Sequence, residues 1–248
     1  MIREPDEIAP GLYRLGTEQV NWYLLDDGAD LCVIDAGFPK LADTLEQDLE
    51  RAGLSADRIR TVVLTHSDGD HMGMARALQQ RGARVFIHEA DDASLRRPGP
   101  KGGDASVPKL LASLRRPEVR KILAHTIKHG GMKPPKVEGA ETFRDGDALP
   151  GGLTAVHTPG HTRGHCALLH RERRVLFAGD ALLDHELVTK GRGPQIMPPY
   201  TNIDTGQALA SLDAIEALDG DVDLLLFGHG EPWTAGIAAA VSSARAHG

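Results

Sequence analysis

The stretch from Val62 to Gly73, VVLTHSDGDHMG, holds the transition that decides the fold. Its apolar run ends abruptly in two histidines and two aspartates: His66, Asp68, Asp70 and His71. Four such side chains cannot all be hidden in an apolar core, because burying polar and charged groups without partners is costly. The stretch therefore predicts a buried strand that delivers a polar site to its own end.

The segments around this stretch alternate strands with helices. Up to about residue 91, apolar runs around Asp-Gly turns predict antiparallel strands, and IRTVVLTH, MGMARALQQRG and ARVFIHE predict a strand, a helix and a strand. From about 92 to 140 the chain is rich in Pro, Gly, Lys and Arg around one predicted helix, VPKLLASLRRPEVRKILAHTI. Beyond it, LTAVHTPGHTRGHCALLH, RRVLFAGDALL and VDLLLFGHGEPW predict strands, and TGQALASLDAIEAL and AGIAAAVSSARA predict helices. The alternation in both outer sections predicts a layered α/β fold.

The composition is that of a globular protein, with 41% hydrophobic and 25% charged residues. The net charge of -7 argues against a nucleic-acid partner. The basic residues are concentrated, however: residues 92–136 hold 11 Lys and Arg against 3 Asp and Glu. This uneven charge sets the middle section apart from the rest of the chain.

The two cysteines, Cys32 and Cys166, lie in apolar runs. They predict buried thiols in a reducing compartment rather than a disulfide framework. The first residues, MIREPDEIAPGLYRLG, show no basic and then apolar leader, and no later run approaches the length of a membrane span. We therefore expect a cytoplasmic protein without a membrane span.

Residues suited to metal binding recur at the ends of four apolar runs. They are His66, Asp68, Asp70 and His71 after TVVL, His161 after TAVHTPG, Asp180 after VLFAG, and His229 after LLLFG. Neighbouring glycines let the backbone turn sharply at these points, and loops at strand ends often carry function. Imidazole and carboxylate groups are the ligands of zinc and related divalent ions. Seven ligands are too many for one tetrahedral ion, so we expect two ions with Asp180 between them.

The pattern resembles the metallo-β-lactamase superfamily over most of the chain. THSDGDHMG is similar to the H-x-H-x-D-H loop of that family, and TPGHTRGH, LFAGDALL and LLFGHGEPW are similar to its later motifs. CVIDAG, with Asp35 and Gly37, is similar to an earlier one. The resemblance implies a four-layer αβ/βα sandwich in which two mixed β-sheets are flanked by helices. It also implies one domain over residues 1–248, with a basic insertion at about 92–140.

The resemblance further implies a metal-dependent hydrolase in which a metal-bound hydroxide attacks the substrate. By motif match, His66 and His161 belong to the first metal, Asp70, His71 and His229 to the second, and Asp180 to both. Asp70 is then the catalytic residue that orients the hydroxide and passes on its proton. The substrates implied are a small ester, lactone, thioester, amide or phosphoester.

Asp68 departs from the family pattern, which has a histidine at this position. It is a direct ligand of the first metal, an acceptor that orients a histidine, or the cause of a weak first site. With three carboxylates ionised and one bridging hydroxide, the ligands carry four negative charges against two divalent cations. Oxygen ligands favour harder ions, so zinc remains the first expectation and iron or manganese are the alternatives.

Other residues near these motifs receive supporting roles. We expect Asp35 to accept hydrogen bonds that hold the metal loop, and His157 and His165 to lie outside the ligand set. Cys166 is expected to be a core thiol. Tyr200, in MPPYTN, is a candidate substrate-binding residue that could donate a hydrogen bond to an oxyanion.

The basic section at about 92–140 is either a solvated face or a lid over the site. As a lid, its Lys and Arg residues and its apolar face meet an anionic or amphiphilic small-molecule substrate, or another subunit. That apolar face comprises Leu110, Leu111, Leu114, Ile122 and Leu123.

Two other function classes stay open from the sequence. One is a non-hydrolytic, iron-dependent redox enzyme of the same fold, either diiron or similar to a persulfide dioxygenase. The resemblance implies that the diiron relatives have a carboxylate in place of the histidine at the Asp68 position. The other is a metal-binding module without turnover, against which the full ligand set argues. From the short tail after His229 we expect no helical substrate domain of the kind that glyoxalase II enzymes have, which disfavours a glutathione thioester.

Overall fold

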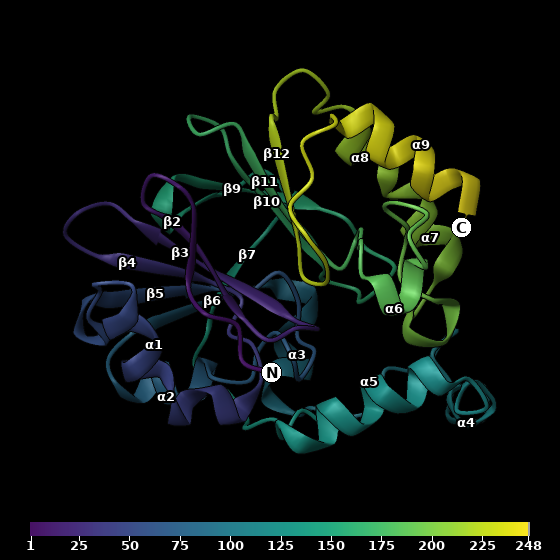
Figure 1. Cartoon of the computed structure of the whole chain (residues 1–248), viewed down its shortest axis with the longest axis horizontal. Coiled ribbons are helices and arrows are strands. Elements are labelled where there is room, and N and C mark those ends of the chain that lie inside the picture. The colour runs from purple at the N-terminus through teal and green to yellow at the C-terminus, as the bar shows by residue number, and fades with distance from the viewer. Residues whose placement is uncertain (248) are drawn as a thin grey trace.

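Two β-sheets form the centre of the protein in a computed structural model that describes residues 1–247, except the side chains of Val107 and Leu110 (Figure 1). The first sheet has seven strands that follow one another in chain order. They are β1 (Asp6–Ala9), β2 (Leu12–Gly16), β3 (Asn21–Asp26), β4 (Leu31–Ile34), β5 (Ile59–Val63), β6 (Arg84–His88) and β7 (Glu141–Phe143). Strands β1 to β4 pair antiparallel and β4 to β7 pair parallel, so the sheet is mixed.

The second sheet has five strands in the order β12-β11-β10-β9-β8. They are β8 (Ala148–Leu149), β9 (Leu153–His157), β10 (Cys166–His170), β11 (Val175–Gly179) and β12 (Leu224–Phe227). Strands β11 and β12 pair parallel and the other neighbours pair antiparallel, so this sheet is mixed as well.

The helices lie mainly on the outer sides of the sheets (Figure 1). Those before the second sheet are α1 (Leu45–Arg51), α2 (Ala75–Gln80), α3 (Asp92–Arg96), α4 (Val107–Ser113) and α5 (Pro117–Lys128). Those after β11 are α6 (Glu186–Thr189), α7 (Thr205–Ala210), α8 (Leu212–Glu216) and α9 (Ile237–His247). Short 3-10 turns lie at Pro39–Asp43, Ala56–Arg58, Glu89–Asp91, Pro150–Gly152 and Pro199–Thr201.

Three apolar clusters hold the layers together. One joins the first sheet to α1 and α2 through residues such as Leu49 and Leu78, and a second lies between the sheets around Phe177. The third joins the second sheet to α8 and α9 through residues such as Ile215 and Val241. Helix, sheet, sheet and helix therefore follow one another, which confirms the predicted four-layer αβ/βα sandwich.

The parallel pairs explain why polar residues gather at one edge. Because β4 and β5 run parallel, the segments after Ile34 and Val63 leave the first sheet on the same side. The same holds for β11 and β12 in the second sheet, which Asp180 and His229 follow. The two sheets thus deliver their loops to a common rim, as expected for ligand sites in sheets with parallel strands.

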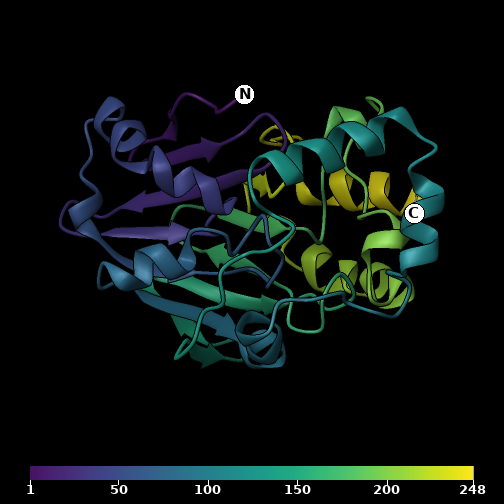
Figure 2. The same cartoon turned by 90° about the horizontal axis from the view of Figure 1, so that it is seen from below.

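The section at 92–140 contains two helices beyond α3, so the prediction of one helix there is wrong. The helix expected over VPKLLASLRRPEVRKILAHTI breaks into α4 and α5, because Pro117 begins a new helix. The helix expected over TGQALASLDAIEAL likewise breaks at Ser211 into α7 and α8. Helix α5 crosses from the N-terminal half to the C-terminal half below both sheets (Figures 1 and 2).

Two further expectations concern the cysteines and the membrane. Cys32 and Cys166 are both free and buried, as predicted. Burial raises the pKa of the Cys32 thiol to about 11 and that of Cys166 further still, so both thiols stay protonated. Within the described residues, none of the helices combines the length and apolar character needed to cross a membrane.

Candidate metal centre

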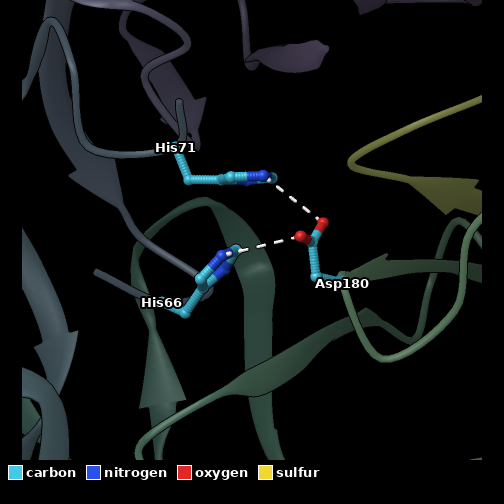
Figure 3. Close-up of side chains that lie close together, drawn as sticks. All are labelled: His66, His71 and Asp180. Atoms are coloured by element: carbon cyan, nitrogen blue, oxygen red, sulfur yellow. Dashed lines mark ion pairs between the residues drawn. The ribbon is translucent and has the colours of Figure 1, made fainter. Parts of the chain in front are cut away.

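The loops after β5, β9, β11 and β12 bring the predicted ligands together between the two sheets. Figure 3 shows His66 and His71 approaching from the first half of the chain and Asp180 facing them from the second. His71 Nε2 lies 3.3 Å from Asp180 Oδ1, and His66 Nε2 lies 3.8 Å from Asp180 Oδ2. All seven residues predicted from the sequence as metal ligands occur in these contacts or in the two groups described next.

His66, Asp68 and His161 form the first ligand group, in which one ligand atom of each residue lies within 4.8 Å of the others. Asp68 Oδ2 lies 3.7 Å from His66 Nε2 and 3.0 Å from His161 Nε2. The carboxylate of Asp68 therefore points into the group, among the atoms that would bind a metal. This geometry favours direct ligation among the three roles open to Asp68.

Asp70, His71 and His229 form the second ligand group, again with ligand atoms within 4.8 Å of one another. His229 Nε2 lies 3.4 Å from His71 Nε2 and 3.7 Å from Asp70 Oδ2. His71 is fully buried, whereas Asp70 is partly exposed. The second group thus has one side open to its surroundings.

Asp180 lies between the two groups. Its Oδ2 is 3.4 Å from His161 Nε2 of the first group and 3.3 Å from His229 Nε2 of the second. The side chain is almost completely buried. A buried carboxylate in contact with both groups has the position expected of a shared ligand.

All four histidines of the centre are held through Nδ1, which leaves Nε2 facing inward. His71 Nδ1 lies 2.8 Å from Asp35 Oδ2, and His229 Nδ1 lies 2.7 Å from the Gln19 carbonyl oxygen. The partners of the other two are Thr65 Oγ1 at 2.9 Å for His66 and Asn202 Oδ1 at 3.0 Å for His161. An Nδ1–H donated to the protein leaves the Nε2 lone pair free, as in metal-bound histidines.

Two side chains that the sequence analysis placed outside the ligand set support the centre. Asp35 accepts hydrogen bonds from the backbone N–H and the hydroxyl of Thr65, and it contacts His71. His165 Nε2 accepts the backbone N–H of Asp180 at 2.9 Å. Burial and the neighbouring His66 hold the pKa of His165 well below its usual range, so His165 is a neutral acceptor. His157, by contrast, stacks on His88 outside the centre.

Gly228 shows how tightly the ligands are packed. A Cβ atom at this position would lie 2.5 Å from Asp180 Oδ1 and 2.5 Å from His71 Cε1. Only glycine lets Asp180 and His71 meet over the backbone between β12 and His229.

The charges of the centre shift its pKa values strongly. Burial opposes ionisation of Asp180, but the neighbouring His229 and His71 outweigh it and hold the pKa of the carboxyl well below its usual range. Burial lowers the pKa of His71 and His229, but Asp180 and the other carboxylates outweigh it and raise them to about 10 and about 9. The carboxylates thus stabilise positive charge between the two ligand groups.

A divalent cation fits this donor set. His66 Nε2 and Asp180 Oδ1 are buried and make no hydrogen bond to the protein, although each faces the other ligands. Buried polar atoms without partners are rare and need an explanation. Imidazole nitrogens and carboxylate oxygens are the donors that zinc, iron and manganese use.

Sequence reasoning missed Lys101, which contacts two of the ligands themselves. Its Nζ lies 2.5 Å from Asp68 Oδ2 and 2.8 Å from His161 Nε2. Burial opposes ionisation of Asp68, but the Lys101 ammonium, followed by the neighbouring His161 and His66, holds the pKa of the carboxyl well below its usual range. The sequence RRPGPKGGD marks Lys101 only as one basic residue among many, so no spacing signal could have singled it out.

An apolar pocket of about 190 Å³ opens onto the second ligand group. Asp70 and His229 lie at its polar end, and Tyr200 lies in its wall. Its apolar lining comes from α5 and the segments opposite: Val20, Phe38, Val119, Ile122, Leu123, Leu183, Val188, Met197 and Pro198. Tyr200 therefore borders the space beside the candidate centre, and burial raises the pKa of its hydroxyl.

The apolar face expected for the 92–140 section is only partly directed at the pocket. Ile122 and Leu123 line it, whereas Leu111 on α4 is 60% exposed and is not part of its lining. Helices α4 and α5 point in different directions (Figure 1). The side chain of Leu110 lies outside the described residues.

Comparison with known families and proteins gives a consistent match. The model of the metallo-β-lactamase superfamily matches residues 15–229. A Bacillus subtilis protein named Probable metallo-hydrolase YflN is 28% identical, over 92% of this chain and 87% of that protein. A Gallus gallus protein named Acyl-coenzyme A thioesterase MBLAC2 is 29% identical, over 88% of this chain and 74% of its own length.

Solved structures show the same fold. A metallo-β-lactamase family protein from Thermus thermophilus has a TM-score of 0.67 and 28% identity, covering 97% of this chain and 80% of that one. A Cronobacter sakazakii metallo-β-lactamase variant has a TM-score of 0.70 and 24% identity, covering 98% and 94%.

Proposed function

Because this chain belongs to the metallo-β-lactamase superfamily, we propose that it hydrolyses a small ester or thioester at a centre that takes up two divalent metal ions. His66, Asp68 and His161 would hold the first ion, and Asp70, His71 and His229 the second. Asp180 would contact both. The observation that carries the proposal is the set of four inward-facing Nε2 atoms and three carboxylates beside an apolar pocket.

A metal held by these residues would supply an acidified water and polarise the carbonyl oxygen of the substrate. Zinc is the first candidate, and the three carboxylates keep iron and manganese as competitors. Asp70 lies where the second group meets the pocket, so its carboxylate would orient the attacking water and hold the proton that this water loses. Tyr200 in the pocket wall would donate a hydrogen bond to the developing oxyanion.

The pocket supports an acyl group as the part of the substrate next to the reacting carbonyl. Its lining is mostly apolar, and its volume of about 190 Å³ is smaller than the roughly 300–1,000 Å³ of sites for drug-sized ligands. The polar phosphate of a phosphoester would make no favourable contact with this apolar wall. An ester or thioester with a short acyl chain matches both the wall and the metal ligands.

A second cavity supports an anionic or amphiphilic leaving group. It shares lining residues such as Val119, Ile122 and Tyr200 with the pocket and adds two arginines, Arg116 and Arg192, beside Glu118. The name of the Gallus gallus relative specifies a thioester with such a group, acyl-coenzyme A. We therefore place thioesters first among the substrates to be tested.

The test is a panel of ester, thioester, lactone and phosphodiester substrates with acyl chains of increasing length. The protein is stripped with a chelator and reloaded with zinc, manganese or iron. We expect metal-dependent hydrolysis of short-chain thioesters or esters. Hydrolysis of phosphodiesters alone, or turnover that survives metal removal, would contradict the proposal.

A matched pair of variants on α5 tests the role of the pocket. Ile122→Trp fills the pocket, whereas Ile127→Trp changes the same residue type on an exposed position that is 58% accessible. We expect Ile122→Trp to raise the KM for the best acyl substrate and to shorten the preferred chain, and Ile127→Trp to leave both unchanged. The same KM in all three proteins would remove the pocket from the proposal.

A further inference from the structure

Lys101 belongs to the section between α3 and α4, yet its ammonium reaches the first ligand group. Its Nζ contacts Asp68 Oδ2 at 2.5 Å and His161 Nε2 at 2.8 Å, and it donates to the Thr201 carbonyl oxygen at 3.2 Å. The side chain is 18% exposed. All three N–H donors of the ammonium therefore have an acceptor nearby.

The backbone around Lys101 is anchored to the segment that also supports His161. The Asp104 N–H donates to the Ile203 carbonyl oxygen at 2.9 Å, and the Ala105 N–H donates to that of Asn202 at 2.6 Å. The side chain of the same Asn202 contacts His161 Nδ1. The position of Lys101 is thus tied to the position of a metal ligand.

Gly103 makes this close approach possible. A Cβ atom there would lie 2.0 Å from the Ile203 carbonyl oxygen, and its φ of +67° favours glycine. The pairing of the two segments therefore depends on a glycine two residues from Lys101. Backbone hydrogen bonds to Asn202 and Ile203 therefore hold the stretch that carries the lysine.

The Lys101 ammonium and a metal ion in the first group would compete for the same ligand atoms. A metal in the first group needs the lone pairs of Asp68 Oδ2 and His161 Nε2. The ammonium donates hydrogen bonds to these same two atoms. The two cations would also repel each other at contact distance. Among the described residues, neither lysine nor arginine forms an ion pair with Asp70, His71 or His229 of the second group.

We infer that Lys101 is an internal cation that competes with metal for the first ligand group. The chain then binds one ion tightly between Asp70, His71, His229 and Asp180, and a second ion more weakly between His66, Asp68 and His161. The inference rests on the metal centre of the proposed function but not on its substrate. It adds a residue that sets metal stoichiometry.

The test is a calorimetric titration of the metal-stripped full chain with zinc and with cobalt. For the unchanged protein we expect two binding events of unequal affinity. Lys101→Met keeps the length of the side chain but removes its charge, and it should strengthen the weaker event at least about tenfold while the stronger event stays the same. Lys109→Met is the matched control, because the Lys109 ammonium pairs with Asp104, at 3.5 Å, away from the ligands, and it should change neither event.

Two results would overturn the inference. One is equal affinity of the two events in the unchanged protein, which does not depend on how any variant folds. The other is a weaker event that keeps or loses affinity in Lys101→Met and in a second variant, Lys101→Gln, with the stronger event intact. A failed substrate screen leaves these titrations untouched, so the two proposals fail separately.

Discussion

The two ligand groups share Asp180 but differ in what lies against them. The first group, His66, Asp68 and His161, contacts an ammonium from the section at 92–140. The second group, Asp70, His71 and His229, faces an apolar pocket walled by α5 from the same section. The section at 92–140 therefore places a charged side chain against the first group and apolar side chains beside the second.

This difference gives the two groups different properties: one is open to a substrate, and the other is balanced in charge by Lys101. The second group, beside the pocket, is accessible to a substrate. The positive charge that balances its carboxylates must come from a bound metal ion or from protonated histidines. The group beside Lys101 already has its negative charge balanced by the chain. We expect the second group to dominate metal binding and turnover, and the following changes test that ordering from the largest effect to the smallest.

Removing the shared ligand should have the largest effect. Asp180→Ala takes away a carboxylate that contacts histidines of both groups. We expect loss of both metal binding events and a fall in turnover of more than about a hundredfold, beyond the loss typical of groups that only support a ligand. Metal analysis and steady-state rates check this, with Asp221→Ala, an exposed carboxylate paired with Arg171, as the control. Full metal content with full turnover would refute the shared role.

Removing one histidine from each group compares them directly. His229→Ala should weaken the tighter ion about a hundredfold, and His161→Ala should change that ion's affinity by less than about threefold. Both histidines contact Asp180 Oδ2 at similar distances, 3.3 and 3.4 Å, so the contrast reports on the groups and not on the shared carboxylate. Equal losses in the two variants would break the ordering.

Gly228→Ala tests whether the packing of the second group matters. Its added Cβ would press on Asp180 and His71, so both must shift. We expect the tighter ion to bind about tenfold more weakly, measured by competition with a colorimetric chelator. Gly206→Ala on α7 is the control, because its Cβ meets only an ordinary contact with Asp204 at 3.4 Å. An unchanged metal affinity in Gly228→Ala would show that the loop can move to accommodate the added Cβ without disturbing the ligands.

A layered α/β fold and the candidate ligands could be predicted because both depend on short local patterns, whereas the four-layer arrangement was implied by the resemblance to a known family. An apolar run that stops at His66, or at Asp180, marks a strand end from the residues alone, and parallel pairing then brings such ends to one rim. The helix breaks at Pro117 and Ser211 were missed because the apolar spacing continues across them. Pro117 begins α5, whereas Ser211 keeps a helical backbone between α7 and α8, with φ of -64° and ψ of -17°.

Lys101 and Asn202 could not be found from the sequence. Lys101 reaches Asp68 only because Gly103 lets residues 101–105 lie against the segment around Ile203, a contact between positions about a hundred residues apart. Asn202 holds His161 Nδ1 through the same pairing. Such partners follow from tertiary packing, and a single sequence carries no periodic signal for them.

The basic residues of the section at 92–140 should have a smaller effect, limited to substrate binding. Reversing the charge of Arg115, Arg116, Arg120 and Lys121 should raise the KM for an anionic thioester about fivefold and leave the KM for a neutral ester unchanged, because exposed charges contribute weakly. Initial rates at two salt concentrations check this. An unchanged KM for the anionic substrate would leave these residues as a solvated face.

The smallest expected effect is a loss of stability in mild acid, caused by His125 on α5, the helix that lines the pocket beside the second group. Burial, and then the neighbouring His129, lowers the pKa of His125 on α5 to about 4, while Glu18 opposes the shift. Between about pH 6.5 and 4 the unfolded chain binds a proton at His125 that the folded chain does not, so stability falls as the pH falls through this window. His125→Gln should flatten that part of the profile in thermal unfolding, and exposed His247→Gln should not. The same slope in all three proteins would count against it.

The most direct measurement is an anomalous difference map from crystals grown with zinc, recorded at the zinc edge. The account predicts a strong peak between Asp70, His71, His229 and Asp180, and a weaker peak or none between His66, Asp68 and His161. A peak on the Lys101 side stronger than the one beside the pocket, or zinc bound away from Asp180, would contradict it.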